Sequence, residues 1–195
     1  TGADLLFAPS QSEVYPSGFD TCVTVSDLSA GLCGAYRSGH FEGVATVVTK
    51  LLLQSMPDIA VFGEKDYQQL LVIKRLVRDL DIGVQIVGAP TIREADGLAV
   101  SSRNVYLTLD ERVIAPALYE TLCGLAKTVA DGGAECAVAC QEAKSALIAA
   151  GFCKVDYVAV CDAITLKSLS RVEQPARILA AVHLGKARLI DNVAV

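Results

Sequence analysis

The chain has 195 residues, a formal net charge of −5 and a hydrophobic fraction of 52%. That length allows one large domain or two small ones, each with a real core. The acidic balance gives no broad basic surface, so neither nucleic acid nor an anionic membrane is expected as a partner. The apolar runs fall short of the roughly 18 residues that cross a bilayer, and no signal sequence is recognised. We therefore expect a soluble, cytoplasmic protein.

Seven cysteines are scattered along the chain, and no two of them form a Cys-x-x-Cys pair. Only two histidines are present to complete a metal site, so the pattern argues against zinc and we assign no metal ligands. Most of the cysteines lie in apolar stretches, where a reduced thiol behaves as a small hydrophobic side chain. The pattern favours reduced cysteines in a reducing compartment, and a redox function is the least favoured hypothesis.

The first half of the chain alternates apolar runs of strand length with longer stretches of helical period. This alternation is typical of an α/β fold with a parallel sheet and crossover helices. The predicted elements are a strand over residues 4–9, a helix over 43–56, a strand over 58–62, a helix over 67–80 and a strand over 85–87. Together they make a βαβαβ unit with right-handed crossovers. Residues 11–40 form the one long stretch without clear periodicity, and such loops are often functional.

The character of the sequence changes beyond residue 89. Thr108 and Glu111 form a capping-box pattern that predicts a helix through about Val129, ended by Asp131, Gly132 and Gly133. A second helix is predicted over 135–150, followed by short strands over 155–161, 176–183 and 187–190. These elements indicate helices beside a small antiparallel sheet. We therefore place a domain boundary near residue 89.

Gly63, Glu64, Lys65 and Asp66 directly follow the predicted strand over 58–62 and open the next helix. They would lie at the carboxyl edge of a parallel sheet, where ligands of open α/β sheets bind. Backbone N–H groups at a helix start, together with the positive charge of Lys65, favour an anion such as phosphate. The competing interpretation is a capped helix whose Lys65 and Asp66 pair at the surface.

Residues 92–104 concentrate polar and charged side chains in an otherwise apolar chain. Ser101, Ser102, Arg103 and Asn104 supply hydrogen-bond donors and one fixed positive charge, which is what a polyphosphate needs from its binding site. Ordinary helix capping and turn formation account for the same residue types equally well. The segment by itself therefore leaves both interpretations open.

Arg37 and His40 end the long loop and enter the helix over 43–56. Arg37 is suited to hold a carboxylate with two hydrogen bonds, and His40 to donate a hydrogen bond or move a proton near neutral pH. The alternative is a histidine that caps its helix. Gln68 and Gln69 lie early in the helix over 67–80, where one of the two side chains can reach a substrate hydroxyl, although exposed polar residues on a helix are the commoner explanation. His183 lies on an apolar strand and is expected to be structural.

Four ordered motifs together resemble the pantoate-β-alanine ligase (pantothenate synthetase) family of adenylate-forming ligases, and the resemblance runs along essentially the whole chain. The motifs are Arg37-x-x-His40-Phe41-x-Gly43-Val44, Gly63-Glu64-Lys65-Asp66-x-Gln68-Gln69-Leu70, Asp96-Gly97-Leu98-Ala99-x-Ser101-Ser102-Arg103-Asn104 and Arg188-Leu189-Ile190-Asp191-Asn192. The resemblance implies that residues 1–88 are the C-terminal part of a Rossmann-like nucleotide-binding domain. It implies that residues 89–195 form a small α+β domain that closes over ATP.

The resemblance also implies an activity, the ATP-dependent ligation of pantoate and β-alanine by an acid–amine ligase (EC 6.3.2.1). Pantoate attacks the α-phosphate of Mg-ATP, which gives pantoyl adenylate and pyrophosphate, and β-alanine then attacks the acyl group and releases AMP. ATP and Mg²⁺ are the implied cofactors, and a homodimer is the implied assembly. The implied catalytic residues, which act on phosphate charge, are Lys65, Ser101, Ser102 and Arg103. The implied ATP contacts are Gly63, Glu64, Lys65, Asp66, Ile92, Val100, Ser101, Ser102 and Arg103, and the implied substrate contacts are Gln69, Arg37 and His40.

One part of the family pattern is missing. The family carries a His-x-Gly-His motif near its amino terminus, which grips ATP and supplies a catalytic histidine, and neither histidine of this chain belongs to such a motif. Residues 2–9 match a strand in the middle of the nucleotide-binding domain, so roughly the first third of a typical member is absent. We therefore expect a fragment that is nearly inactive alone. The alternative is a non-catalytic remnant that binds nucleotide or pairs with a partner through an exposed sheet edge.

Overall fold

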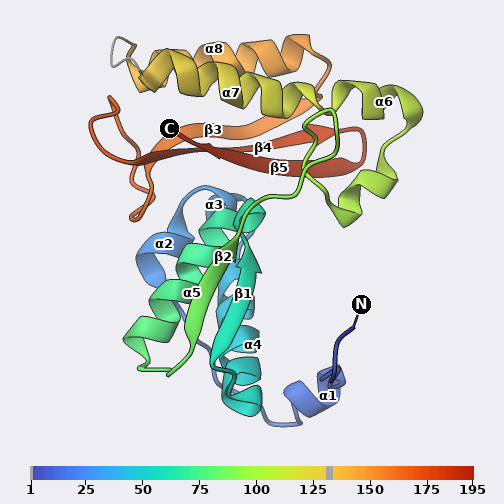
Figure 1. The fold of residues 1–195 in the computed structure, drawn as a ribbon, viewed down its shortest axis with the longest axis vertical. Helices are drawn as coiled ribbons and strands as arrows, with labels where there is room; N and C mark the ends of the chain where they lie inside the picture. Colours follow the sequence, from blue (N-terminus) through green and yellow to red (C-terminus); the bar gives the residue numbers. More distant parts are fainter. Residues whose placement is uncertain (1, 131–133) are drawn as a thin grey trace.

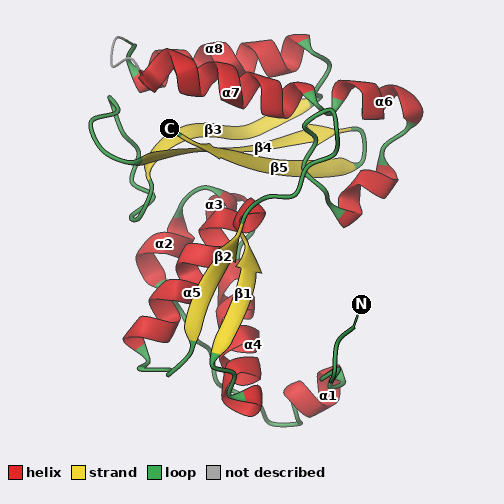
Figure 2. Cartoon of the chain, in the orientation of Figure 1, coloured by secondary structure: helices red, strands yellow, loops and turns green. Residues whose placement is uncertain are grey.

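The computed structural model describes residues 2–130 and 134–195, and it contains two separate sheets (Figure 1). The strands are β1 (Ile59–Gly63), β2 (Gln85–Ala89), β3 (Lys154–Asp162), β4 (Ala176–Leu184) and β5 (Ala187–Ala194). β1 and β2 pair in parallel, whereas β3, β4 and β5 form an antiparallel sheet in that order. We call the elements up to β2 the parallel unit and those after it the antiparallel unit (Figure 2). This architecture confirms the predicted fold class.

In the parallel unit, α4 (His40–Ser55) and α5 (Tyr67–Asp79) bury their apolar faces beside the two strands. The buried side chains of this core include Leu28, Phe41, Ala45, Leu52, Val72, Ile73 and Leu76. Both helices and both strands confirm the predicted elements, with shifts of one to three residues at most ends. Because the strands run in parallel, their carboxyl ends at Gly63 and Ala89 meet at the same edge of the sheet. That edge faces the antiparallel unit (Figure 1).

The predicted strand over residues 4–9 is wrong. This segment has no strand pairing, and the side chains of Leu5 and Leu6 are 84% and 85% exposed. Figure 1 shows it running apart from the two paired strands, before α1. An apolar run becomes a strand only when a neighbouring backbone completes its hydrogen bonds, and none of the described residues does so here. The parallel sheet of the described chain therefore has two strands rather than three.

Residues 11–40 contain three short helices where the sequence indicated none. They are α1 (Gln11–Val14), α2 (Ser26–Ala30) and α3 (Cys33–Tyr36). Each has only four or five residues, too few to show a helical period. Leu28 and Cys33 are buried in the core of the parallel unit, which holds this part of the loop against α5.

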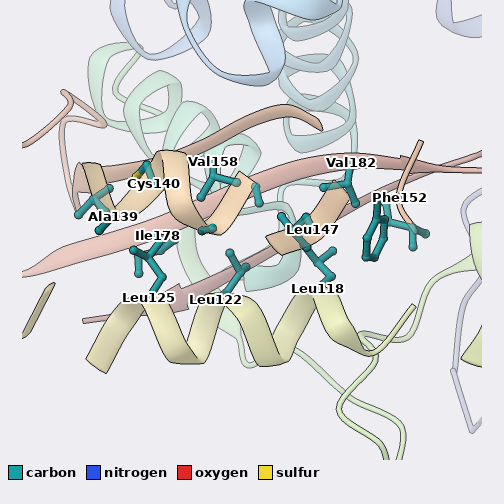
Figure 3. Close-up of a cluster of buried hydrophobic side chains, with 14 of the residues drawn as sticks. Leu118, Leu122, Leu125, Ala139, Cys140, Leu147, Phe152, Val158, Ile178 and Val182 are labelled. Atoms are coloured by element: carbon teal, nitrogen blue, oxygen red, sulfur yellow. The ribbon is translucent and has the colours of Figure 1, made fainter. Parts of the chain in front are cut away.

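The antiparallel unit is a sheet covered on one face by α7 (Ala117–Ala130) and α8 (Cys136–Ala149). Figure 3 shows Leu118, Leu122 and Leu125 of α7 meeting Ile178 of the sheet and Leu147 of α8. The predicted antiparallel strands and the second helix are confirmed. β5 continues to Ala194, four residues beyond the prediction, because the polar Asp191 and Asn192 interrupt the apolar pattern yet are buried in the sheet.

The predicted helix from Thr108 to about Val129 is two helices. α6 (Leu109–Ile114) begins with the expected capping box, and α7 begins after Pro116, which cannot donate the hydrogen bond of a helix interior. The predicted helix end at Asp131, Gly132 and Gly133 lies outside the described residues. By length and composition alone, residues 109–130 could cross a membrane, which is weak evidence because core helices of soluble proteins pass the same test. Leu118, Leu122 and Leu125 of this stretch are buried against the sheet.

All seven cysteines lie within the described residues, where each is a free thiol. Cys136, Cys140 and Cys161 are buried with the apolar side chains of the antiparallel unit. Burial raises the pKa of the Cys161 thiol to about 11, so it is protonated and unreactive at neutral pH. These three residues therefore pack as small hydrophobic side chains.

Candidate functional site

A cleft with about 400 Å³ of empty space, counting the part open to solvent, lies where the two units meet. Its lining includes five of the residues singled out from the sequence, which come from the segment that leads into α4, from the turn between β1 and α5 and from the first turn of α5. These residues are Arg37, His40, Lys65, Asp66 and Gln69. Leu179, Ala180 and residues 190–192 line it from the antiparallel unit. Two short motifs separated by more than twenty residues of sequence thus share one cavity.

A second, smaller hollow adjoins the cleft. It is lined by Lys65 together with Ser101 and Asn104 of the polar loop, and by Ile190 and Asp191 of β5. Lys65 and Asp191 line both cavities. Lys65 is thereby the side chain that links the parallel-sheet edge with the loop carrying Ser101.

The turn from β1 to α5 has the geometry expected of an anion site. Gly63 ends β1 at the carboxyl edge of the sheet, Glu64–Asp66 form the 3-10 helix η1, and α5 starts directly at Tyr67. A helix start at such an edge offers backbone N–H groups and the positive end of a dipole. The side chain of Glu64 turns to the antiparallel unit instead, where its Oε2 lies 3.2 Å from the guanidinium of Arg177. The surface pair between Lys65 and Asp66 that the competing interpretation required does not occur among the ion pairs of the described residues.

The loop over 92–104 begins as a small hairpin. Arg93 and Ala99 form an antiparallel bridge, and the N–H of Val100 donates to the carbonyl of Ile92 at 2.9 Å. Gly97 lies at the tip with a φ of +90°, a value that favours glycine. The Arg93 guanidinium donates two hydrogen bonds to the Asp191 carboxylate, at 2.6 and 2.9 Å. This buried pair attaches the loop to β5.

The serine and arginine side chains that follow take part in local structure. Ser101 Oγ accepts a 3.2 Å hydrogen bond from the Arg103 N–H and so caps the 3-10 helix η2 (Ser102–Tyr106). The Arg103 guanidinium donates to the carbonyl of Arg188 at 3.0 Å. Ser102 is exposed, and Ile92 and Val100 are 72% and 52% exposed. The capping interpretation is therefore correct for Ser101, whereas Ser102, Ile92 and Val100 face solvent.

Arg37 and His40 contact each other at the start of α4. Arg37 Nη1 lies 2.8 Å from His40 Nε2. A guanidinium only donates, so His40 Nε2 is the acceptor and its ring proton sits on Nδ1. Helix α4 is preceded by Gly39 in the left-handed region, with no side-chain cap, so the helix-capping interpretation of His40 is wrong. Burial, and then the nearby Arg37 charge, lower the pKa of His40, although Asp66 opposes them.

We predict that His40 titrates below 6.5, the ordinary value, and that Arg37→Met raises its pKa. The proton has to enter a half-buried ring beside a guanidinium, so the folded chain loses stability as the pH falls through this lowered pKa. ¹H–¹⁵N NMR titration of the histidine rings measures this pKa. Arg112→Met, in an exposed ion-pair cluster with Glu94 and Asp96, is the control and should leave it unchanged. A wild-type value at or above 6.5 would contradict the prediction.

Cys33 and Tyr157, which the sequence analysis did not assign to the site, also line the cleft. Tyr157 Oη and Cys33 Sγ are 3.0 Å apart, and the guanidinium of Arg188 lies 3.6 Å from the same sulfur. Arg188 is held in turn by Asp156, which also contacts His183 at 3.1 Å. The expected structural role of His183 agrees with this contact. The available signals were the place of Arg188 in the fourth motif and the charge of Asp156 on an otherwise apolar strand.

Gln68 and Gln69 have different environments. Gln68 is buried and donates to the carbonyls of Leu28 and Gly31, both at 2.8 Å, so it braces the loop before α3. Both residues line the cleft. The two differ in that the Gln68 amide is already engaged by the loop before α3.

The fold and the cleft define an α/β protein that gathers cationic side chains and a helix start between two units, as a binder of anionic ligands requires. The sequence model of the Pantoate-beta-alanine ligase family matches residues 1–194. The chain belongs to the pantoate-β-alanine ligase family.

Relatives and solved structures agree with this membership. Pantothenate synthetase of Paramagnetospirillum magneticum is 59% identical over 197 residues, which cover 100% of this chain and 68% of that protein. The crystal structure of pantothenate synthetase from Thermus thermophilus has a TM-score of 0.91 at 50% identity, over 98% of this chain and 70% of that one. The Francisella tularensis ligase, complexed with β-γ ATP and β-alanine, has a TM-score of 0.73 at 34% identity over 95% and 62%. The chain thus spans about two thirds of the length of these proteins.

Proposed function

We propose that the cleft between the two units is the site at which this chain takes part in the ATP-dependent ligation of pantoate and β-alanine. Membership of the family supplies the reaction. The observation that carries the assignment to this cleft is the convergence of Arg37, His40 and Lys65, from separate parts of the chain, in one cavity. The Francisella tularensis ligase, a relative in fold, is solved with β-γ ATP and β-alanine.

The reaction has two steps, each of which moves charge. A carboxylate oxygen of pantoate attacks the α-phosphorus of ATP, and the bond to the β-phosphate oxygen breaks, which releases pyrophosphate. The amine of β-alanine then attacks the acyl carbon of pantoyl adenylate, loses a proton and expels AMP. Negative charge grows on phosphate oxygens in the first step and on the AMP leaving group in the second. Fixed positive charges and N–H donors therefore lower both barriers.

For ATP we propose contacts on both sides of the cleft. Gly63, Glu64, Lys65 and Asp66 offer the helix-start N–H groups, and Lys65 places its charge between the two cavities. Ser101, Ser102 and Arg103 approach from the other side, with Ile92 and Val100 as exposed apolar contacts for the nucleotide. Lys65, Ser101, Ser102 and Arg103 are the proposed catalytic residues.

For pantoate and β-alanine we propose Gln69, Arg37 and His40. Gln69 lines the cleft and has an amide for a substrate hydroxyl. Arg37 brings a positive charge for a carboxylate, and His40 is neutral at neutral pH because its pKa is lowered. A neutral ring keeps Nδ1–H as a donor, whereas Nε2 is already occupied by Arg37.

We also propose Mg²⁺ bound with ATP. No group of three or more acidic, cysteine or histidine side chains among residues 2–130 and 134–195 is arranged to hold a metal ion. That suits Mg²⁺, which often binds through one or two carboxylates, waters and the phosphates themselves. Asp66 lines the cleft, whereas the Asp191 carboxylate is engaged by Arg93. Asp66 is thus the carboxylate we propose for Mg²⁺, which would neutralise phosphate charge.

The remaining parts of the proposal concern organisation. The two units correspond to domains over residues 1–88 and 89–195, since each has its own sheet and its own cluster of buried side chains. A homodimer and a cytoplasmic location are expected by analogy with the family. The 195-residue chain alone is expected to be nearly inactive, because neither histidine belongs to a His-x-Gly-His motif.

Titration of the 195-residue chain with Mg-ATP tests the site. We expect Lys65→Ala to weaken ATP binding about 10-fold to 100-fold, because a charged hydrogen bond is worth roughly 1.5–3 kcal/mol. Lys74→Ala, at an exposed lysine on α5, the helix that follows Lys65, is the matched control and should bind within twofold of wild type. Isothermal titration calorimetry gives the dissociation constants. Equal binding by wild type and Lys65→Ala would reject Lys65 as a phosphate contact.

The non-catalytic alternative makes a different prediction. Pantothenate formation is measured for the chain alone and for the chain mixed with a polypeptide bearing the His-x-Gly-His segment of a relative. Activity that returns on mixing supports an intact ligase site. ATP binding without any return of activity would favour a nucleotide-binding remnant.

A further inference from the structure

Asn192, near the end of β5, is 3% exposed and uses its whole side-chain amide for contacts. Its Nδ2 donates to the backbone carbonyls of Glu64 at 3.0 Å and of Lys65 at 2.9 Å. Its Oδ1 accepts from Arg177 Nε at 2.7 Å. One buried side chain of the antiparallel unit therefore holds two successive peptide groups of the turn that carries Lys65.

Arg177 determines how this amide is oriented. The guanidinium only donates, so the atom it meets must be the oxygen, and the NH₂ group must face the two carbonyls. Arg177 is itself fixed by Glu64 Oε2 at 3.2 Å and by the Tyr67 ring, with the guanidinium carbon 4.1 Å from the ring centroid. Asn192, Arg177 and Glu64 thus form a closed set of contacts across the two units.

These contacts fix more than the carbonyl oxygens. A planar trans peptide points its N–H opposite to its C=O. Holding the carbonyls of Glu64 and Lys65 therefore also fixes the direction of the N–H groups of Lys65 and Asp66, and the direction in which the Lys65 side chain leaves the turn. Those N–H groups and that ammonium are what the turn offers to a phosphate.

We propose that Asn192 is a positioning residue for ATP, which acts through the Lys65 turn and is not itself a phosphate contact. The inference rests on the proposed function, because it concerns how the Lys65 turn is presented to the triphosphate. An amide is required at this position, since its NH₂ reaches two carbonyl oxygens and its oxygen reaches a guanidinium. No other side chain of the same size supplies both.

A double-mutant cycle with Mg-ATP as the probe tests this. Asn192→Asp keeps the size and the acceptor for Arg177 but turns the two donors into an oxygen that faces two carbonyls. We expect it to weaken ATP binding by the 195-residue chain about tenfold. In the Lys65→Ala background the same change should weaken binding less than threefold, because the ammonium, the one full charge that Asn192 orients, has been removed. Calorimetric titration of the four proteins gives the cycle.

Two further variants keep the test interpretable. Asn192→Ser replaces the two amide donors by one shorter hydroxyl without burying a charge, so it answers the question if the aspartate variant does not fold, and its thermal unfolding is measured in parallel. Gln174→Glu makes the same amide-to-carboxylate change at an exposed turn, where Gln174 contacts Asp162 at 2.7 Å. It should bind ATP within twofold of wild type.

Each outcome supports or overturns the inference. Weak binding by both Asn192 variants, with the effect lost in the Lys65→Ala background, supports it. Wild-type binding by both Asn192 variants, while Lys65→Ala binds weakly, overturns it and leaves the proposed function standing. Equal losses in both backgrounds overturn it as well, because the effect of Asn192 would then not pass through the Lys65 ammonium. If Lys65→Ala binds as wild type does, the proposed phosphate role of Lys65 fails and this inference fails with it.

Discussion

Replacing Asp191 by alanine is expected to destabilise the folded chain by about 3–5 kcal/mol, the usual effect of leaving a buried charge without its partner. The Arg93 side chain is 18% exposed and that of Asp191 is 3% exposed, so water cannot replace the lost carboxylate. The Arg93 guanidinium also donates to the Gly97 carbonyl at 3.0 Å and lies 3.7 Å from the centre of the Tyr119 ring. Without Asp191, the remaining hydrogen bond from Arg93 to β5 is the 3.4 Å contact with the Asn192 carbonyl.

The same change should loosen the hairpin that leads to the proposed phosphate contacts. Urea unfolding measures the stability, and amide hydrogen exchange at Glu94, Leu98 and Val100 measures the hairpin. Asp79→Ala is the control, because its pair with Arg78 is exposed at 49% and 69% and should be worth less than about 1 kcal/mol. A loss for Asp191→Ala as small as that of Asp79→Ala would show that the buried pair contributes little.

Replacing Asp156 by alanine is expected to destabilise the chain by about 3 kcal/mol or more at neutral pH. The Asp156 side chain is 2% exposed and has three cationic or titratable neighbours, with Arg188 Nε at 2.8 Å, Lys154 Nζ at 3.0 Å and His183 Nε2 at 3.1 Å. Burial by itself would raise the pKa of this carboxyl, but hydrogen bonds from Arg188, Lys154 and His183 outweigh it and lower the pKa to about 2.

The lowered pKa gives this prediction a pH signature. The folded-state value is about 2 against an ordinary 3.8, so the ionised form contributes about 2 kcal/mol that is fully present above 3.8. The contribution is lost as the pH falls toward 2. Urea unfolding at pH 7 and at pH 3 should therefore show the wild type and Asp156→Ala drawing closer in acid. Lys154→Ala, which removes a partner that is 61% exposed, should change stability by less than about 1 kcal/mol. A stability gap that is constant with pH would disprove the ion-pair explanation.

The elements predicted best are those whose side chains repeat with the period of their own structure. Helices α5 and α8 and the central parts of β3 and β4 lie where the apolar spacing places them. The segment over 4–9 has an equally apolar pattern and is not a strand, because a pattern does not supply a neighbouring strand. Pro116 indicates a break between α6 and α7, but the apolar residues keep a helical period on both sides of it, so the sequence predicted one helix.

In the candidate site, too, some residues could be predicted from the sequence and others could not. Lys65, Arg37 and His40 were found because charged residues at a strand end or a helix start stand out against an apolar sequence. Asn192 and Asp156 were missed as single residues, because a buried polar side chain on a strand has the same local pattern as an exposed one. Their partners Glu64, Lys65 and Arg188 are 32 to more than 120 residues away in the chain. No spacing rule within a motif relates residues at such separations.

The order of the longer helices and strands after residue 40, the antiparallel sheet after residue 89 and the chemistry of the three polar motifs follow from the order of residues, because each depends on neighbours within a few positions. The meeting of those motifs in one cleft, with Gln69 in its lining, depends on the packing of the two units. That packing is held by contacts such as the ion pair of Glu64 with Arg177 and the hydrogen bonds of the Asn192 amide. Such contacts form only when distant segments meet and exclude water, and a linear sequence carries no local sign of them.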